Sequence, residues 1–213
     1  MGSEFLSEYL QRHQPASGAN APSLTSLALF AYGSLVSIPS AEATLGRPVE
    51  QAGTARLAGW RRRWSQVRDN RATEKTFAHA ETGAVPSHCL GLNIERVLDD
   101  DGPNGVLIEI SEAELDRLDA REIRYGRVEV TDAVASGFER VVTFAAKPEN
   151  FAPTPPTGAV VLAPYLRAVE AGFSALGPDQ LELFRETTGP VPVEVIDAVL
   201  VRDEIPPGNP RDW

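Results

Sequence analysis

The sequence contains one cysteine and three histidines among 213 residues, and this scarcity excludes two kinds of site. Cys89 cannot form an internal disulfide and cannot alone supply a structural zinc site. The histidines at positions 13, 79 and 88 have neither HxxxH nor HxH spacing. A metal centre built from protein ligands is therefore not expected.

Long apolar runs are also missing. No stretch approaches the roughly 20 consecutive apolar residues of a membrane helix. Residues 1–14 include charged and polar residues where a secretory signal would carry a continuous apolar segment. Twenty Lys and Arg against thirty Asp and Glu give a net charge of −10, which repels anionic membranes and polyphosphate. We expect a cytoplasmic protein that binds neither a membrane nor nucleic acid.

The length favours one domain with a short appendage. Residues 4–13 carry apolar side chains at helical spacing, and residues 14–23 are rich in Pro, Ala, Gly and Ser. We predict a short helix on a flexible tether over residues 1–23 and a single domain over residues 24–213. Residues 2–5 resemble a cloning remnant, and no role is assigned to them.

Within the domain, predicted strands outnumber predicted helices. Compact apolar runs or period-two alternation predict strands at 24–32, 51–67, 76–81, 89–97, 127–130 and 138–145. Segments 164–176 and 178–187 each begin with a proline suited to the first helical turn, and both have apolar residues at helical intervals. Without strict βαβ alternation, this order predicts an α+β fold around a mixed sheet, open or closed.

Prolines mark two irregular segments. Residues 147–158 contain four prolines, which predicts an extended loop in a position to cover a site. Residues 205–213 are also proline-rich and are predicted to lie extended on the surface.

A helix is predicted to begin at Ser111. Ser111 is the N-cap, and Glu114, three residues later, completes a capping box. Ile110 and Leu115 occupy the two positions of a hydrophobic staple.

This helix turns a carboxylate toward the core. At about 100° per residue, Leu115, Leu118 and Glu122 fall within about 60° of one another, so Glu122 is predicted to face inward. Burial raises the pKa of an unpaired carboxyl group and makes it a better proton acceptor near neutral pH. Two alternatives stay open: the helix frays before residue 122, or Glu122 pairs with an arginine such as Arg124 or Arg127.

A second feature is the apolar segment 29–35, which is interrupted by Gly33 and Ser34. Glycine permits a turn with positive φ, and successive N–H groups in such a turn can hold a carboxylate or an oxyanion. The same pattern also ends ordinary hairpins.

Together these features resemble a known family. Residues 30–35, FAYGSL, resemble the Tyr-Gly-Ser loop of the gamma-glutamylcyclotransferase-like superfamily, which includes the AIG2-like proteins. Residues 118–122, LDARE, match its Leu-Asp-x-x-Glu pattern, which carries the catalytic glutamate. The resemblance extends from residue 27 to about 177 and includes Pro155-Pro156 and Tyr165.

The resemblance implies a mixed, barrel-like sheet with peripheral helices and a cavity for a γ-glutamyl group. It implies cyclisation of that group to 5-oxoproline, with release of the attached amine and without a metal or organic cofactor. Glu122 would act as general base and acid, and the substrate-binding residues would be Tyr32, Gly33, Ser34, Leu35, Tyr125 and Tyr165. The loop lacks the asparagine of the longer Tyr-Gly-Ser-Asn-Leu form, and Tyr125 lies closer to the glutamate than in some members.

This chemistry suits the residues that are present. The substrate's own α-amine attacks its γ-carbonyl, so the reaction is intramolecular and needs no protein nucleophile. One carboxylate near both nitrogens can move the proton from the attacking amine to the departing one. The Gly33 loop would bind either the α-carboxylate or the oxyanion. The resemblance specifies neither the leaving amine nor an oligomeric state.

Three other interpretations use different features. Residues 56–75 contain seven basic and two acidic side chains around Trp60 and Trp64, which is typical of a surface for an anionic ligand or nucleic acid. Alternatively, these arginines form ion pairs with acidic residues elsewhere in the chain. In that case one arginine faces the mouth of the cavity and selects the leaving group. A second interpretation makes Ser34 the nucleophile of an amidase. The sequence around Ser34 lacks the second glycine of a Gly-x-Ser-x-Gly elbow, which argues against this role. A non-catalytic AIG2-like binding protein would keep the same fold.

Overall fold

The computed structural model of the chain describes residues 27–98 and 100–210. The predicted helix and tether over residues 1–23 lie outside these ranges. None of the helices in the described ranges is both long and apolar enough to cross a membrane.

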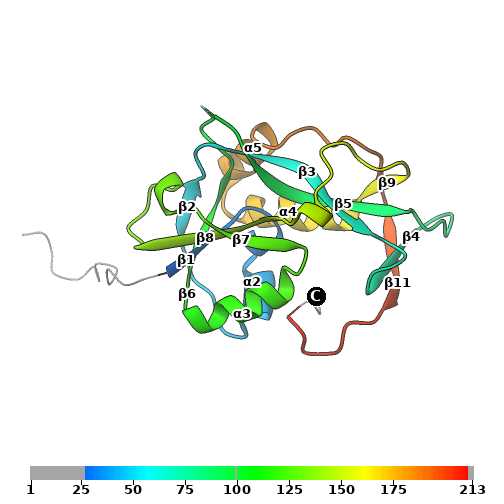
Figure 1. The fold of residues 1–213 in the computed structure, drawn as a ribbon, viewed down its shortest axis with the longest axis horizontal. Coiled ribbons are helices and arrows are strands. Elements are labelled where there is room, and N and C mark those ends of the chain that lie inside the picture. The colour runs from blue at the N-terminus through cyan, green and yellow to red at the C-terminus, as the bar shows by residue number, and fades with distance from the viewer. Residues whose placement is uncertain (1–26, 99, 211–213) are drawn as a thin grey trace, which may run out of the picture.

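The described elements are mainly strands, joined by short helices (Figure 1). The strands are β1 (Leu27–Ala31), β2 (Gln51–Arg56), β3 (Trp60–Asp69), β4 (Lys75–His79), β5 (His88–Arg96), β6 (Asn104–Ile110), β7 (Tyr125–Glu129), β8 (Arg140–Ala146), β9 (Ala159–Leu162), β10 (Val195–Ile196) and β11 (Ala198–Asp203). The helices are α2 (Ile38–Leu45), α3 (Glu112–Arg121), α4 (Ala163–Ala175) and α5 (Pro178–Glu186), with short 3₁₀ turns η1 (Ser34–Val36), η2 (Thr131–Ala133) and η3 (Pro148–Asn150).

These strands form three sheets. One has the order β2-β6-β1-β8-β7, the second has the order β10-β9-β5-β3, and β11 pairs with β4 in a separate ribbon. This ribbon lies at one end of the molecule (right in Figure 1). The α+β class and the mixed sheet are confirmed, since β1 runs antiparallel to β6 and parallel to β8. Among the described strands there is no closed barrel, so the barrel-like closure is not observed.

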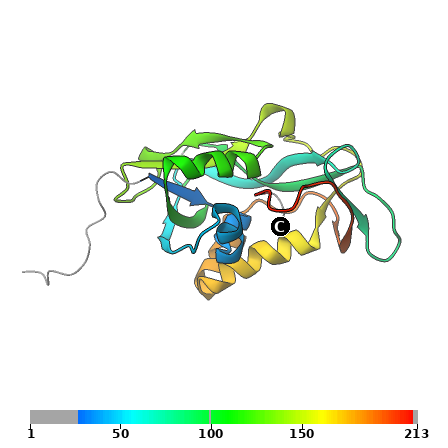
Figure 2. The same ribbon diagram turned by 90° about the horizontal axis from the view of Figure 1, so that it is seen from below.

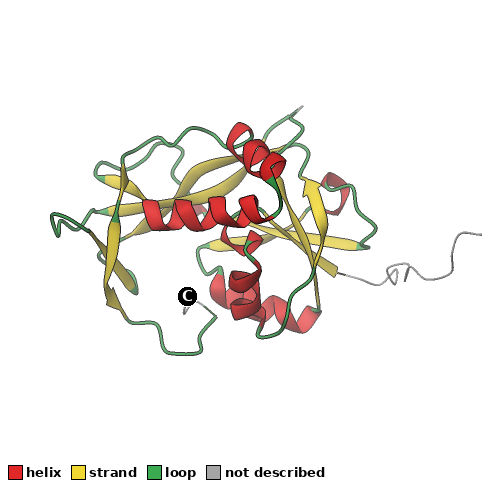
Figure 3. Cartoon of the chain, turned by 180° about the vertical axis from the view of Figure 1, so that it is seen from behind, coloured by secondary structure: helices red, strands yellow, loops and turns green. Residues whose placement is uncertain are grey.

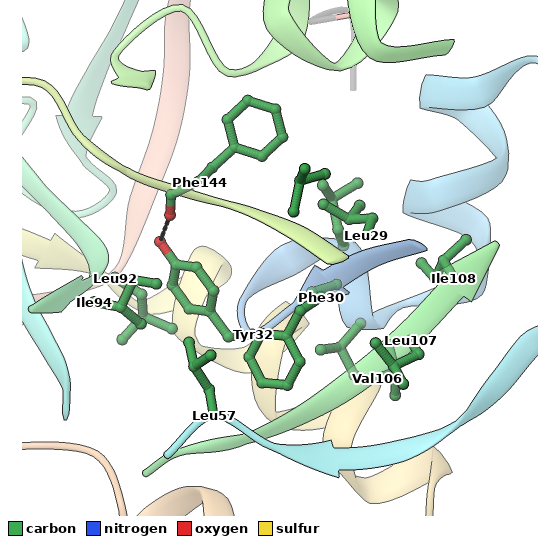
Figure 4. Close-up of a cluster of buried hydrophobic side chains, with 14 of the residues drawn as sticks. Leu29, Phe30, Tyr32, Leu57, Leu92, Ile94, Val106, Leu107, Ile108 and Phe144 are labelled. Carbon is green, nitrogen blue, oxygen red and sulfur yellow. Dashed lines mark hydrogen bonds between the residues drawn. The ribbon is translucent and has the colours of Figure 1, made fainter. Parts of the chain in front are cut away.

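Strand β1 is the central strand of the largest sheet, and all five of its residues are buried. Its uniformly apolar sequence suits a strand covered on both faces. Phe30 and Leu29 pack among side chains of β6 in the core (Figure 4). Gly105 permits this contact, because a Cβ atom there would lie 2.3 Å from the Ala31 carbonyl oxygen.

The helices cover the sheets from different sides. Figure 2 shows α2 between α3 (green) and α4 (yellow), and α2 packs against α3 while α4 packs against η1. Figure 3 shows α4 running across the strands from behind. This arrangement brings the end of α3 next to the segment that follows β1.

Most predicted elements are confirmed within a few residues. Helix α3 begins after Ser111, whose backbone N–H donates to the Glu114 carboxylate at 2.8 Å, as the capping box requires. The single strand predicted over 51–67 is wrong, because the chain turns at Gly59 (φ 74°) and β2 and β3 join different sheets. Strands β6, β9, β10 and β11 and helix α2 were not predicted.

The arginine-rich strand β3 divides its side chains between two environments. Arg61 and Arg63 form exposed ion pairs with Asp100 and Glu95, as the pairing alternative predicted. Arg62 is fully buried instead. The alternation of exposed and buried side chains along this strand thus accounts for these three residues.

Arg62 connects three parts of the core. Its Nη1 atom donates to the carbonyl oxygens of Tyr32, at 3.0 Å, and Asn104, at 2.8 Å. Its guanidinium carbon lies 5.0 Å from the Phe173 ring centroid and 4.4 Å from that of Phe184. The charge is therefore stabilised by carbonyl dipoles and aromatic faces, and the Tyr32 carbonyl is held in place.

We predict that Arg62→Ala lowers the free energy of unfolding by about 3 kcal/mol or more, because each buried acceptor left unpaired costs about 1–3 kcal/mol. Arg61→Ala is the matched control on the same strand, and loss of its exposed ion pair should cost less than about 1 kcal/mol. Urea unfolding followed by tryptophan fluorescence measures both. Equal losses in the two variants would contradict this role of Arg62.

Candidate active site

The segment after β1 forms one wall of the candidate site. The chain leaves the sheet at Tyr32 and enters the 3₁₀ turn η1 at Ser34. Gly33 has φ −135°, so the predicted positive-φ turn is wrong. Among the described residues, no acceptor is bonded to the backbone N–H of Ser34 or of Leu35, as is usual for the first residues of a helical turn.

Glu122 forms the opposite wall. It is the C-cap residue of α3, and its backbone N–H donates to the Leu118 carbonyl at 2.7 Å. The helix therefore ends one residue before it, yet the side chain still points inward and is only 17% exposed. Its predicted partners have other contacts: Arg124 binds Glu74 and Arg127 binds Asp119. Glu122 does pair with an arginine, as one alternative predicted, but the partner is neither Arg124 nor Arg127.

Arg121 is the actual partner of Glu122. Its Nε atom lies 3.1 Å from Glu122 Oε1, and only 2% of its side chain is exposed. Nη1 donates to Thr44 Oγ1 at 2.6 Å, and Nη2 donates to Ser40 Oγ at 3.0 Å and to Ser34 Oγ at 3.2 Å. Arg121 therefore joins the end of α3 to both η1 and α2.

Two adjoining cavities meet at Glu122. The inner cavity has a volume of about 50 Å³ and is lined by the end of β1, η1 and residues of β5 and β8. The outer cavity has a volume of about 340 Å³ and opens toward β4, β11 and α4. Both are lined by Ser34, Glu122, Tyr125 and Tyr165, so these four side chains lie where the cavities join.

All the site residues predicted from the sequence line the inner cavity: Tyr32, Gly33, Ser34, Leu35, Glu122, Tyr125 and Tyr165. Residues 147–158 line neither cavity, so the expectation that this loop covers a site is wrong. Ile205 of the proline-rich tail lines the outer cavity rather than only the surface. Neither cavity has a histidine among its lining residues, which leaves Ser34 without the partner base of an amidase.

The three tyrosines differ in what their hydroxyl groups do. Tyr32 Oη donates to the Phe144 carbonyl at 2.7 Å (dashed line in Figure 4), and Tyr125 Oη donates to the Leu92 carbonyl at 2.8 Å. Tyr165 Oη instead accepts a hydrogen bond from the Leu92 N–H at 3.5 Å. Its own proton has no acceptor among the described residues and is available to a molecule in the cavity.

Burial sets the ionisation of this site. Burial raises the pKa of Glu122 above its ordinary value of 4.5, and the Arg121 charge and hydrogen bond oppose that rise. Burial also raises the pKa of Tyr165 to about 12. At neutral pH the Tyr165 phenol is thus a hydrogen-bond donor, while Glu122 is a stronger proton acceptor than an exposed carboxylate.

Arg121 is the functional residue that sequence reasoning missed. It lies three residues after Leu118 and so shares the inward stripe of α3, which was a detectable signal. Within the described ranges, no three His, Cys, Asp or Glu side chains are grouped as metal ligands would be.

Comparison with known proteins identifies the fold. No family model and no curated protein matches the sequence. A solved structure described as a gamma-glutamyl cyclotransferase is similar, with a TM-score of 0.51 and 16% identity over 78% of this chain and 93% of that one. An uncharacterized protein from Homo sapiens has a TM-score of 0.53 and 18% identity over the same shares. The chain therefore has a gamma-glutamylcyclotransferase-like fold, which is what similarity at this level of identity shows.

We predict that Arg121→Gln raises the pKa of Glu122 further, because it removes the positive charge that opposes the effect of burial. A ¹³C NMR titration of the Glu122 carboxyl group, assigned by comparison with Glu122→Gln, measures this pKa. Arg124→Gln is the control, since Arg124 pairs with Glu74 and should leave the Glu122 pKa nearly unchanged. A pKa that falls or stays constant in Arg121→Gln would refute the assignment.

Proposed function

We propose that this protein cyclises a γ-glutamyl amide to 5-oxoproline and releases the attached amine, with Glu122 as general base and acid. The observation that carries the proposal is the position of the Glu122 carboxylate, which lines both cavities opposite the Tyr-Gly-Ser segment. The gamma-glutamylcyclotransferase-like fold supports it. So does the match at Leu118 and Asp119, which precede this glutamate in the family pattern.

The reaction places different demands on the two cavities. The γ-glutamyl group enters the narrow inner cavity in a bent conformation, which brings its α-nitrogen to its γ-carbonyl carbon. The amine bonded to that carbon then extends past Glu122 into the outer cavity. The scissile C–N bond lies where the cavities join, beside the carboxylate.

Glu122 moves one proton during the cycle. The neutral α-amine attacks the γ-carbonyl carbon, the new C–N bond closes the five-membered ring, and Glu122 accepts a proton from the attacking nitrogen. When the tetrahedral intermediate collapses, the original C–N bond breaks and Glu122 returns the proton to the departing nitrogen. The products are 5-oxoproline and the free amine, and the carboxylate is regenerated.

Hydrogen-bond donors stabilise the negative charge of the bound glutamyl group and of the transition state. Ser34, Leu35 and Tyr165 line the inner cavity, and the backbone N–H protons of the first two and the hydroxyl proton of Tyr165 have no acceptor among the described residues. Donors held in place before the reaction begins stabilise developing charge without reorganisation.

We expect Glu122→Gln to lose cyclisation activity by at least about a hundredfold, because the amide keeps the size but cannot accept a proton. A panel of γ-glutamyl amino acids and γ-glutamyl amines, with 5-oxoproline measured by mass spectrometry, tests the proposal. Asp119→Asn is the control, since Asp119 lies in the same motif but pairs with Arg127. An inactive wild-type protein that still binds these compounds would favour a non-catalytic binding protein.

We also predict that Tyr165→Phe lowers kcat/KM about tenfold or more while the free energy of unfolding changes little, since its hydroxyl proton has no acceptor among the described residues. Tyr32→Phe should instead lower the free energy of unfolding by about 1–3 kcal/mol, because it leaves the buried Phe144 carbonyl unpaired. Steady-state kinetics and urea unfolding distinguish the two effects. Wild-type kcat/KM in Tyr165→Phe would show that the hydroxyl does not contact substrate.

A further inference from the structure

The outer cavity is far larger than the cyclisation chemistry alone requires. Its volume of about 340 Å³ lies within the range of small-molecule sites, about 300–1,000 Å³, whereas the inner cavity has only about 50 Å³. The outer cavity shares Ser34 and Glu122 with the inner one. If the inner cavity holds the glutamyl group, the outer one must receive the leaving amine.

Much of the outer wall is apolar and comes from segments far apart in the sequence. Phe77 of β4, Leu90 of β5, Leu162 of β9, Leu200 of β11 and Ile205 after β11 all line it. Leu200 remains 46% exposed, so a bound molecule would cover apolar surface that now faces water. Burying such surface favours a ligand with a bulky apolar group.

The same wall holds four cations, and their partners differ. Arg121, Arg124 and Lys75 each form an ion pair with a carboxylate, namely those of Glu122, Glu74 and Asp203.

Arg68 is different, because its guanidinium donates only to neutral acceptors among the described residues. These are Thr73 Oγ1, the Lys75 carbonyl and Asn70 Oδ1, and the guanidinium also interacts with the neutral Cys89 thiol, which lines the same cavity. Its guanidinium carbon also lies 5.2 Å from the Phe77 ring centroid. A cation beside an apolar wall, without a carboxylate partner within the described ranges, suits a ligand that brings its own carboxylate.

Building on the proposed function, we infer that the outer cavity is a subsite selective for a leaving group that is an α-amino acid with a bulky apolar side chain. The side chain packs against Phe77, Leu162 and Leu200, and the α-carboxylate binds Arg68. The substrates are then γ-glutamyl dipeptides of leucine-like or aromatic amino acids, in preference to γ-glutamyl conjugates of small amino acids or of uncharged amines.

Three matched substrates test the two contacts separately. γ-Glutamyl-leucine has both groups, γ-glutamylglycine lacks the side chain, and γ-glutamyl-isopentylamine lacks only the carboxylate. We expect kcat/KM to fall about tenfold or more on loss of the side chain and about tenfold or more on loss of the carboxylate. Equal kcat/KM within either pair overturns the inference but leaves the proposed function intact.

Variants locate each contact. Leu200→Ser should lower kcat/KM for γ-glutamyl-leucine severalfold and leave kcat/KM for γ-glutamylglycine unchanged. Val199→Ser is the control, because Val199 is the neighbouring exposed residue of β11 and does not line the cavity.

Arg68→Gln should reduce kcat/KM for γ-glutamyl-leucine to the value for γ-glutamyl-isopentylamine. Arg68→Lys keeps the positive charge and should restore part of the difference in kcat/KM between these two substrates. Retention of wild-type selectivity in both Leu200→Ser and Arg68→Gln contradicts the subsite.

Binding separates this inference from the proposed reaction. If the wild-type protein cyclises none of the three compounds, isothermal titration calorimetry of the same compounds with the wild-type protein and with Glu122→Gln decides the matter. Tighter binding of γ-glutamyl-leucine than of both other compounds, by about tenfold, supports the subsite and overturns only the cyclisation. Equal binding, or no binding, of the three overturns the inference as well.

Discussion

The candidate site depends on one buried guanidinium group. Arg121 bonds Glu122 on its own helix, and it also donates to hydroxyl groups of Ser34 in η1 and of Ser40 and Thr44 in α2. The loop and the carboxylate are nearly ninety residues apart in the sequence, yet this side chain sets their relative position. A buried charge is tolerated only when its donors are satisfied, so the whole network must form together.

Arg62 provides the matching support on the other side of the loop. It binds the carbonyl of Tyr32, the first residue of the Tyr-Gly-Ser segment, while Arg121 binds the hydroxyl of Ser34, the last residue. The loop is therefore held at both ends by charged groups that are themselves buried. Residues 32–35 line the inner cavity, and the two arginines help to set their positions.

The site, rather than the fold alone, supports the proposed chemistry. Similarity at 16% and 18% identity establishes the architecture and nothing about the substrate. A buried carboxylate with a raised pKa, available N–H groups and a phenol donor are what an intramolecular acyl transfer needs. In the proposed reaction, the narrow inner cavity holds the reacting group and the wide outer cavity holds the leaving group.

The sequence by itself determined the local features: the buried strand β1, the capped start of α3, the helices α4 and α5, and the inward direction of Glu122. Each depends on periodicity or on contacts within a few residues, which a single chain reveals. Only the tertiary structure decided that Glu122 pairs with Arg121 rather than Arg124, because that choice depends on the hydroxyl groups of α2 and η1 that surround Arg121. It likewise separated β2 from β3 and brought Leu200 and Ile205 to the outer cavity, since pairing between distant strands leaves no short-range pattern in the sequence.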